Sequence, residues 1–198
     1  MIKVVIFDIG GVTVKSSMPF VYRTVGSKFG LDAIKVERTF ENICPLAETG
    51  KFSPQELWSE LAKKLEIKNV KALKNIWLDS FRKHAVINKN VVRIIKRVNN
   101  NGYKVVTLSN TMEPHEKLHI KKGHYKFFDR VFLSNRLGIR KPDIKIYRRV
   151  AKKLKVKTSE CIFIDDKIRN VIGARKAGMK GVWFRGVAKL EKDLKKYL

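Results

Sequence analysis

The fold is decided by the stretch Val4-Val5-Ile6-Phe7-Asp8-Ile9-Gly10-Gly11-Val12 near the start of the chain. Its four leading apolar residues are typical of a strand that is buried on both faces. Asp8 follows this strand directly, at the carboxyl end where an open α/β sheet binds its ligands. Gly10 and Gly11 let the backbone turn sharply and approach a bound group closely. Taken alone, the segment fits equally well a buried strand closed by an ordinary Asp-led turn.

Other predicted strands also end in polar residues. The apolar segment 103–108 precedes Ser109 and Asn110, and the segment 161–164 precedes Asp165 and Asp166. Lys141 stands just before Pro142, which we expect to begin a helix because proline suits the first helical turn. Neighbouring parallel strands would bring these ends into one crevice. Three acids, a hydroxyl and a lysine form a set that suits a metal ion and a phosphate.

This ordered set resembles the haloacid dehalogenase superfamily of hydrolases over essentially the whole chain. Asp8 matches the nucleophile motif, Ser109 the second motif, Lys141 the third, and the pair Asp165-Asp166 the fourth. The segments 108–111, 137–142 and 163–166 look closest to one branch of the superfamily. That branch includes bacterial α-glucose-1-phosphate phosphatase and the amino-terminal phosphatase domain of soluble epoxide hydrolase.

The resemblance implies a Mg²⁺-dependent phosphomonoesterase that forms an aspartyl phosphate from a small phosphorylated metabolite such as a sugar phosphate. The catalytic residues it implies are Asp8, Ser109 and Lys141. The metal ligands it implies are Asp8, the carbonyl of Gly10, Asp166 and Asp165, where Asp165 either binds through water or pairs with Lys141. The substrate-binding residues it implies are Gly10, Gly11, Ser109, Asn110 and Lys141.

One position departs from the pattern of the family. Many family phosphatases carry a second Asp two residues after the nucleophile, where it serves as a general acid and base. Gly10 stands at this position here, so water, another residue or the substrate must protonate the leaving group. Asn170 replaces an acid of many relatives, and we expect it to hold the site by hydrogen bonds rather than to bind metal directly.

The sequence between residues 15 and 86 predicts an inserted domain. Apolar residues recur at helical spacing between residues 15 and 86, and Ser53-Pro54-Gln55-Glu56 has the form of a capping box. Alternating strands and helices then resume. We therefore predict an α/β fold with a Rossmann-like parallel sheet covered by helices on both faces, built from residues 1–14 and 87–198. Residues 15–86 would form an all-helical cap.

Several residues outside the four motifs are candidates for substrate contact. Lys15, Phe20 and Tyr22 follow the first loop and could border a small polar ligand, although the two aromatic residues could equally pack within the cap. His115 could replace the missing proton donor. His115 and His119 stand four apart, as in some metal sites, and His124 follows, but exposed histidines without a functional role are the favoured interpretation.

Composition limits the other function classes. The chain has 198 residues, 44% of them hydrophobic, which is enough for one sizeable core and a smaller unit. No apolar run reaches the length of a membrane span, and the start leads directly into a strand, so we expect neither a membrane protein nor a signal peptide. The two cysteines, far apart in sequence, fit a reducing compartment, and a cytoplasmic location is expected. The oligomeric state is left open.

The net charge of +26 arises from 44 Lys and Arg against 18 Asp and Glu. Nucleic-acid binding with little or no catalysis is one explanation, and attraction of small anionic substrates is another. A generally basic surface is favoured because the cations are spread along the chain without a recognisable nucleic-acid-binding motif. A third hypothesis is a metal-independent 2-haloacid dehalogenase that uses the same Asp8. The clustered acids argue against it.

Overall fold

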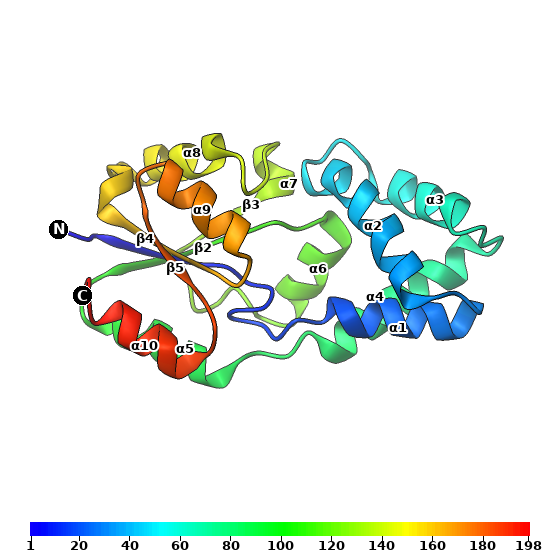
Figure 1. Ribbon diagram of the computed structural model, residues 1–198, viewed down its shortest axis with the longest axis horizontal. Helices are drawn as coiled ribbons and strands as arrows, with labels where there is room; N and C mark the ends of the chain where they lie inside the picture. The colour runs from blue at the N-terminus through cyan, green and yellow to red at the C-terminus, as the bar shows by residue number, and fades with distance from the viewer.

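The computed structural model describes residues 1–198 and has a five-stranded sheet at its centre (Figure 1). All strand pairs are parallel, and the strand order is β3-β2-β1-β4-β5. The strands are β1 (Val4–Phe7), β2 (Lys104–Ser109), β3 (Arg130–Leu133), β4 (Cys161–Asp165) and β5 (Lys180–Trp183). The first strand of the chain therefore lies in the middle of the sheet, between β2 and β4.

The sequence of β1 explains why both faces of the sheet are covered. Successive side chains of a strand point to opposite faces. Val4 and Ile6 pack into one apolar cluster, whereas Val5 and Phe7 pack into another on the opposite face. All four residues are buried, so β1 has no solvent-facing side. Such a strand is stable only when helices cover both faces of the sheet.

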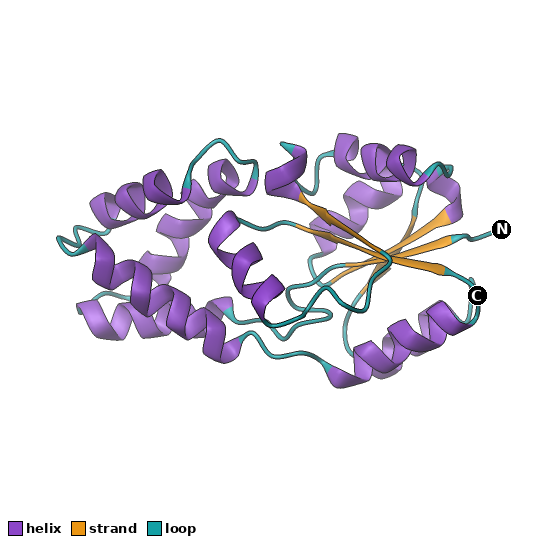
Figure 2. Ribbon diagram, turned by 180° about the vertical axis from the view of Figure 1, so that it is seen from behind, coloured by secondary structure: helices purple, strands orange, loops and turns teal.

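Two pairs of helices provide this cover, as Figure 2 shows with the sheet between two helical layers. α8 (Ile144–Leu154) and α9 (Ile168–Lys176) pack on the face that contains Val4 and Ile6. α5 (Lys89–Asn100) and α10 (Val187–Leu194) pack on the other face. The prediction of an α/β sheet with helices on both faces is confirmed.

A separate group of four helices lies beyond the carboxyl edge of the sheet (Figure 1). It consists of α1 (Met18–Phe29), α2 (Ala33–Glu48), α3 (Pro54–Lys64) and α4 (Val70–His84). These helices share an apolar cluster that includes Tyr22, Phe40, Trp58 and Trp77. The prediction of an inserted helical cap is confirmed, whereas the limits 15–86 stay a prediction.

Local hydrogen bonds explain where several helices begin. Asp32 accepts a hydrogen bond from the N–H of Ile34 (2.9 Å) at the start of α2. Ser53 and Glu56 form both bonds of the predicted capping box at the start of α3. Pro142 does not begin a helix as expected. α8 begins two residues later because Asp143 accepts from the N–H of Lys145 (2.8 Å) and thereby acts as the cap.

The remaining helices connect the core to the cap. α6 (Glu113–Lys121) follows β2 and packs against α4 of the cap. α7 (Ser134–Leu137) follows β3 and contacts α2, and a short 3₁₀ helix (Thr158–Glu160) precedes β4. No helix is both long enough and apolar enough to cross a membrane.

Candidate active site

The register of the three central strands brings the predicted acids together. Phe7, the last residue of β1, lies opposite Thr107 of β2 and Ile164 of β4. The next residue on β1 is Asp8, and the next residue on β4 is Asp165. Ser109 is the last residue of β2, which lies on the other side of β1 from β4. The carboxyl edge of the sheet therefore collects groups that are about 100 and 157 positions apart in sequence, as parallel pairing requires.

Lys141 is the cation at the centre of this edge. Its Nζ lies 2.9 Å from Asp8 Oδ1 and 2.7 Å from Asp165 Oδ2, and it donates to the carbonyl of Leu108 at 2.9 Å. These three acceptors match the three donors of an ammonium group. The side chain is fully enclosed, so the charge is held in one position rather than in a mobile surface chain.

Asp165 is held from several directions and is completely buried. Besides Lys141, it accepts from the N–H of Lys167 (2.8 Å) and from Asn170 Nδ2, which lies 3.0 Å from both carboxylate oxygens. This is the hydrogen-bonding role expected for Asn170. Of the two roles considered for Asp165, the structure shows the pairing with Lys141.

Asp8, Asp165 and Asp166 form the cluster that fits a metal ion. Each offers a carboxylate oxygen, and these three oxygens lie within 4.8 Å of one another. Oδ1 of Asp166 is buried and has no hydrogen-bond partner. The carbonyl of Gly10 accepts no hydrogen bond from the protein. A hard divalent cation prefers oxygen ligands of this kind, so the residues present fit Mg²⁺.

Crowding of the acids changes their ionisation. Burial, with a smaller contribution from Asp165 and Asp166, raises the pKa of Asp8 to about 8, although Lys141 opposes the shift. Burial and Asp165 also raise the pKa of Asp166. Burial disfavours the charged form of Lys141, but Asp165 and Asp8 outweigh this effect and its pKa is raised. A bound cation would favour the ionised carboxylates, so the cluster is suited to bind one.

Gly11 shapes the carboxylate cluster through its lack of a side chain. Its φ is +81°, a region that favours glycine, and a Cβ atom would lie 2.1 Å from Asp166 Oδ2. Its N–H donates to the carbonyl of Val14 (2.8 Å), so it has no free donor for the phosphate contact predicted for it. At Gly10, by contrast, a Cβ would meet no atom within 4 Å.

Ser109 and Asn110, which are predicted to bind phosphate, lie beside the carboxylates. Both residues line the same cavity as Asp8. The side chain of Asn110 is tied to the backbone of Lys141, since it donates to the carbonyl (2.9 Å) and accepts from the N–H (2.8 Å). This pair of bonds fixes the loop that carries the lysine. Asn110 can therefore offer its backbone, rather than its side chain, to a phosphate oxygen.

The cavity has a volume of about 260 Å³ and extends from the sheet edge into the cap. Lys15 and Tyr22 line it, as expected of residues that border a ligand. Phe20 does not line it. That ring is 43% exposed and stacks on His84 on the outside of α1, with a centroid distance of 4.3 Å. The possible contact of Phe20 with a ligand is therefore not supported, because α1 presents Phe20 and Tyr22 to different sides.

The favoured interpretation of the three histidines as exposed is also wrong. His115, His119 and His124 are all buried between the core and the cap. Nδ1 of His119 lies 2.7 Å from Nδ1 of His124, so these two rings bind each other. His115 instead accepts a hydrogen bond from Trp77 and lines the cavity, as does His119. Helix α6 turns His115 and His119 inward because it lies between two packed units, and His124 lies in the turn that follows this helix.

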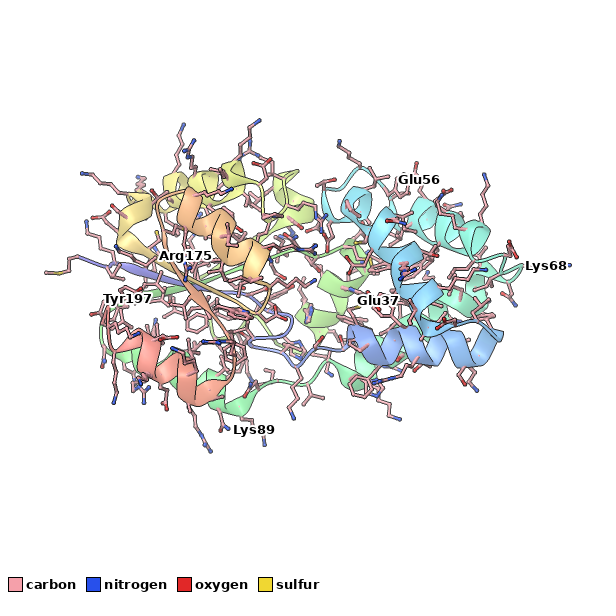
Figure 3. The ribbon with its side chains drawn as sticks, viewed as in Figure 1. Glu37, Glu56, Lys68, Lys89, Arg175 and Tyr197 are labelled. Carbon is pink, nitrogen blue, oxygen red and sulfur yellow. The ribbon has the colours of Figure 1, made fainter.

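Sequence reasoning missed the acidic wall of the cavity. Glu37, Glu41 and Glu48 line it from α2, together with Cys44, and Glu37 is labelled in Figure 3 on the cap helix that faces α6. Glu48 pairs with Arg140 of the core (2.7 Å), whereas Glu37 and Glu41 have no ion-pair partner. The spacing 37, 41, 44 and 48 follows one helix face and could have revealed this wall.

Comparison with known proteins identifies the family. The haloacid dehalogenase-like hydrolase family matches residues 2–178. Drimenol cyclase drtB of Aspergillus calidoustus is 27% identical over 98% of this chain, although the match spans only 36% of that protein. Sesquiterpene phosphatase astK of Aspergillus oryzae is 29% identical over 91% of this chain and 88% of its own length. Glyceraldehyde 3-phosphate phosphatase of Pyrococcus furiosus is 31% identical, over 53% of this chain and 45% of that protein.

Solved structures share the fold. HAD family enzyme bt-2542 of Bacteroides thetaiotaomicron, solved in complex with magnesium and inorganic phosphate, superposes with a TM-score of 0.71 at 21% identity, covering 92% of this chain and 94% of that one. L-2-haloacid dehalogenase of Xanthobacter autotrophicus superposes with a TM-score of 0.69 at 18% identity, covering 100% and 84%. The fold alone therefore does not separate the two reactions. The family match over residues 2–178 shows that this chain belongs to the haloacid dehalogenase-like hydrolases.

Proposed function

We propose that the protein is a Mg²⁺-dependent phosphomonoesterase that acts through an aspartyl phosphate on Asp8. The observation that carries this proposal is the buried, unpartnered Oδ1 of Asp166 within a cluster of three carboxylates beside Lys141. An unsatisfied buried carboxylate oxygen is costly, and a cation bound there would satisfy it. The relatives named as phosphatases, and the related fold solved with magnesium and phosphate, support the same reaction.

Asp8 is arranged to attack phosphorus with one particular oxygen. Oδ1 is held by Lys141 (2.9 Å) and by the N–H of Ile9 (2.7 Å), whereas Oδ2 accepts no hydrogen bond from the protein. Oδ2 is therefore the proposed nucleophile. A bond forms from Oδ2 to phosphorus, the bond from phosphorus to the ester oxygen breaks, and the leaving oxygen takes a proton from solvent. Water then attacks the aspartyl phosphate, returns a proton to solvent, and releases inorganic phosphate and the free carboxylate of Asp8.

The approach of two anions requires compensating charge. Bound Mg²⁺, held by Asp8, Asp166 and the Gly10 carbonyl, would supply positive charge next to the phosphate. Lys141 adds a fixed cation on the other side of Asp8, while the Ser109 hydroxyl and the Asn110 backbone N–H bind phosphate oxygens. Asp165 holds the Lys141 side chain in position and does not contact the phosphate.

The cavity favours a small polar leaving group, such as the sugar of a sugar phosphate. Its volume of about 260 Å³ is below the range of about 300–1,000 Å³ for drug-sized ligands. Only seven of its 27 lining residues are hydrophobic. The unpaired carboxylates of Glu37 and Glu41 can accept hydrogen bonds from hydroxyl groups. The proposed substrate thus agrees better with a glyceraldehyde 3-phosphate phosphatase than with a sesquiterpene phosphatase.

Two alternatives receive less support. A metal-free 2-haloacid dehalogenase would leave the buried Oδ1 of Asp166 unsatisfied. A nucleic-acid-binding role would be favoured by one continuous basic surface, but the Lys and Arg residues are spread along the chain, and Figure 3 places Lys68 at the tip of the cap and Lys89 on the core. A generally basic surface explains this distribution.

The proposal is tested by hydrolysis of p-nitrophenyl phosphate. We expect release of phosphate with Mg²⁺, its loss with a chelator, and its return when Mg²⁺ is added in excess. Equal rates with and without the metal would contradict the proposal. Metal-free release of chloride from a 2-chloro acid would establish the dehalogenase instead. Tight binding of duplex DNA at physiological salt without any hydrolysis would establish the nucleic-acid role, because simple phosphate contacts weaken steeply with salt.

A further inference from the structure

A buried hydrogen bond between Trp77 and His115 joins the cap to the core. Trp77 lies in α4 and is fully buried, and His115 lies in α6 with 7% of its surface exposed. Nε1 of the indole is 3.1 Å from Nε2 of the imidazole. An indole N–H can only donate, so Nε2 of His115 is the acceptor. A neutral imidazole that accepts at Nε2 carries its proton on Nδ1.

The ring of His115 is also held neutral and in one plane. Burial, with a smaller effect from His119, lowers its pKa well below the usual value. Phe81 stacks against it with a centroid distance of 3.7 Å and an interplanar angle of 5°. His115 therefore combines a fixed tautomer with a fixed orientation. It is a poor proton donor but a well-placed hydrogen-bond donor.

Nδ1 of His115 has no hydrogen-bond partner in the protein, and the residue lines the cavity that contains Asp8. The other histidine at this cavity differs, because Nδ1 of His119 is already engaged with His124. Nδ1 is not one of the fully buried atoms without a partner, so it is open to the cavity, where water or a ligand oxygen can accept from it. A ligand that displaces this water without offering an acceptor would leave the Nδ1–H group buried and unsatisfied, which costs free energy.

We propose that His115 donates a hydrogen bond from Nδ1 to an oxygen of the leaving group, with Trp77 as the positioning residue that fixes the tautomer. This inference rests on the proposed phosphatase function. It narrows the substrate class to phosphate esters whose leaving group bears a hydroxyl or carbonyl oxygen beyond the ester oxygen. A hydrocarbon leaving group would bury the donor unsatisfied, and sites built around a hydrogen bond discriminate against such analogues.

The first test observes the tautomer directly and does not depend on catalysis. In ¹⁵N-labelled protein with Mg²⁺, the ring nitrogens of His115 should show a proton on Nδ1 and none on Nε2 at neutral pH. Trp77→Phe should abolish this preference, because phenylalanine has no donor. Trp58→Phe is the matched control, since Trp58 is equally buried in the cap but its Nε1 has no partner. A proton on Nε2 in the wild-type protein would overturn the inference.

The second test compares n-propyl phosphate with glycerol 1-phosphate, which differ only in the hydroxyl groups of the leaving group. We expect the wild type to prefer glycerol 1-phosphate in kcat/KM by about tenfold or more, because the propyl group would leave the Nδ1–H donor buried without an acceptor. His115→Phe, which keeps the stacking on Phe81, should remove the preference, and Trp77→Phe should reduce it. His115→Asn, which retains a donor near the position of Nδ1, should restore part of it.

The outcomes separate this inference from the proposed function. If the wild type hydrolyses p-nitrophenyl phosphate but shows no preference between the two alkyl esters, the donor role of His115 is wrong and the phosphatase stands. A preference that survives in His115→Phe leads to the same conclusion. If the wild type hydrolyses none of the three esters, the phosphatase proposal itself fails. The tautomer measurement then still decides whether Trp77 fixes the ring.

Discussion

The two walls of the cavity use their polar groups in opposite ways. At the sheet edge, Lys141 has three partners and Asp165 is bound by Lys141, Lys167 and Asn170. On the cap side, Glu41 and the hydroxyl of Tyr22 have no hydrogen-bond partner in the protein. The core is therefore organised before any ligand arrives, as transfer of an unchanging phosphate requires. The cap keeps its donors and acceptors free for the variable part of a substrate.

The largest expected effect is on the core side, at the nucleophile. Asp8→Asn should lower kcat by about 10³-fold or more, because an amide cannot form the phosphoenzyme. The loss should be similar for every ester tested, since all of them share the phosphate. Steady-state rates with an aryl and a sugar phosphate measure it. If Asp8→Asn lost activity on one ester alone, Asp8 would act in substrate selection rather than as the nucleophile.

The same variant also has a testable effect on stability. The pKa of Asp8 is raised above its unfolded value in the metal-free protein, so folding takes up a proton and stability falls as pH rises from about 4 to about 8. Asn has no such titration. Without metal, Asp8→Asn should therefore gain in melting temperature relative to the wild type between about pH 5 and pH 8. An unchanged difference across this range would mean that Asp8 does not titrate as described.

Removal of the central cation should affect folding as well as rate. Lys141→Met leaves Asp8 and Asp165 without their buried partner, which typically costs about 3–5 kcal/mol of unfolding free energy. Urea unfolding at neutral pH measures this cost. Lys145→Met is the control, because Lys145 is exposed and its removal should change stability by about 0.5 kcal/mol or less. Equal stability of the two variants would show that the core edge is not held together by Lys141.

Adjacent glycines allow a smaller but more selective test of the core. In Gly11→Ala the new methyl group would collide with Asp166 and strain a left-handed backbone, so Mg²⁺ should be needed at about tenfold or higher concentration. Gly10→Ala meets no atom and keeps the carbonyl, so its dependence on Mg²⁺ should match the wild type. Titration of activity with Mg²⁺ gives both values. Identical curves for the two variants would contradict the role of Asp166 in the metal site.

The smallest expected effects come from the cap. Tyr22→Phe and Lys15→Ala should change kcat/KM among sugar phosphates by a few fold, roughly the lower end of the range for one hydrogen bond. The rate with a minimal ester such as methyl phosphate should stay the same, because it does not reach the cap. A panel of metabolite phosphates measures the ranking. If both variants keep the wild-type ranking, these two residues do not determine specificity.

The core site was largely predictable from sequence, for a physical reason. Parallel strands in a sheet must place their carboxyl ends together, so Asp8, Ser109 and Asp165 could be assigned to one edge before the structure was known. The helix starts at Asp32 and Ser53 were predictable as well, because each cap depends only on residues two or three positions away. Pro142 shows the limit of local rules, because Asp143 was the stronger cap.

The cap side was less predictable because its geometry depends on how whole helices rotate and pack. Nothing near Phe20 in sequence distinguishes its outward position from the inward position of Tyr22, two residues later. The burial of His115 depends on Trp77, which lies 38 positions earlier in a different helix. The acidic face of α2 was visible as a spacing pattern, but its direction toward the cavity was not.

The most direct test of the central claim is the chemical state of Asp8 during turnover. Acid quenching with Mg²⁺ present, followed by mass spectrometry of the proteolytic peptides, should find one phosphate on Asp8. The modification should appear with p-nitrophenyl phosphate and with a sugar phosphate alike, because the core handles the phosphate independently of the leaving group. Turnover without phosphate on Asp8, or with phosphate on another residue, would contradict the account.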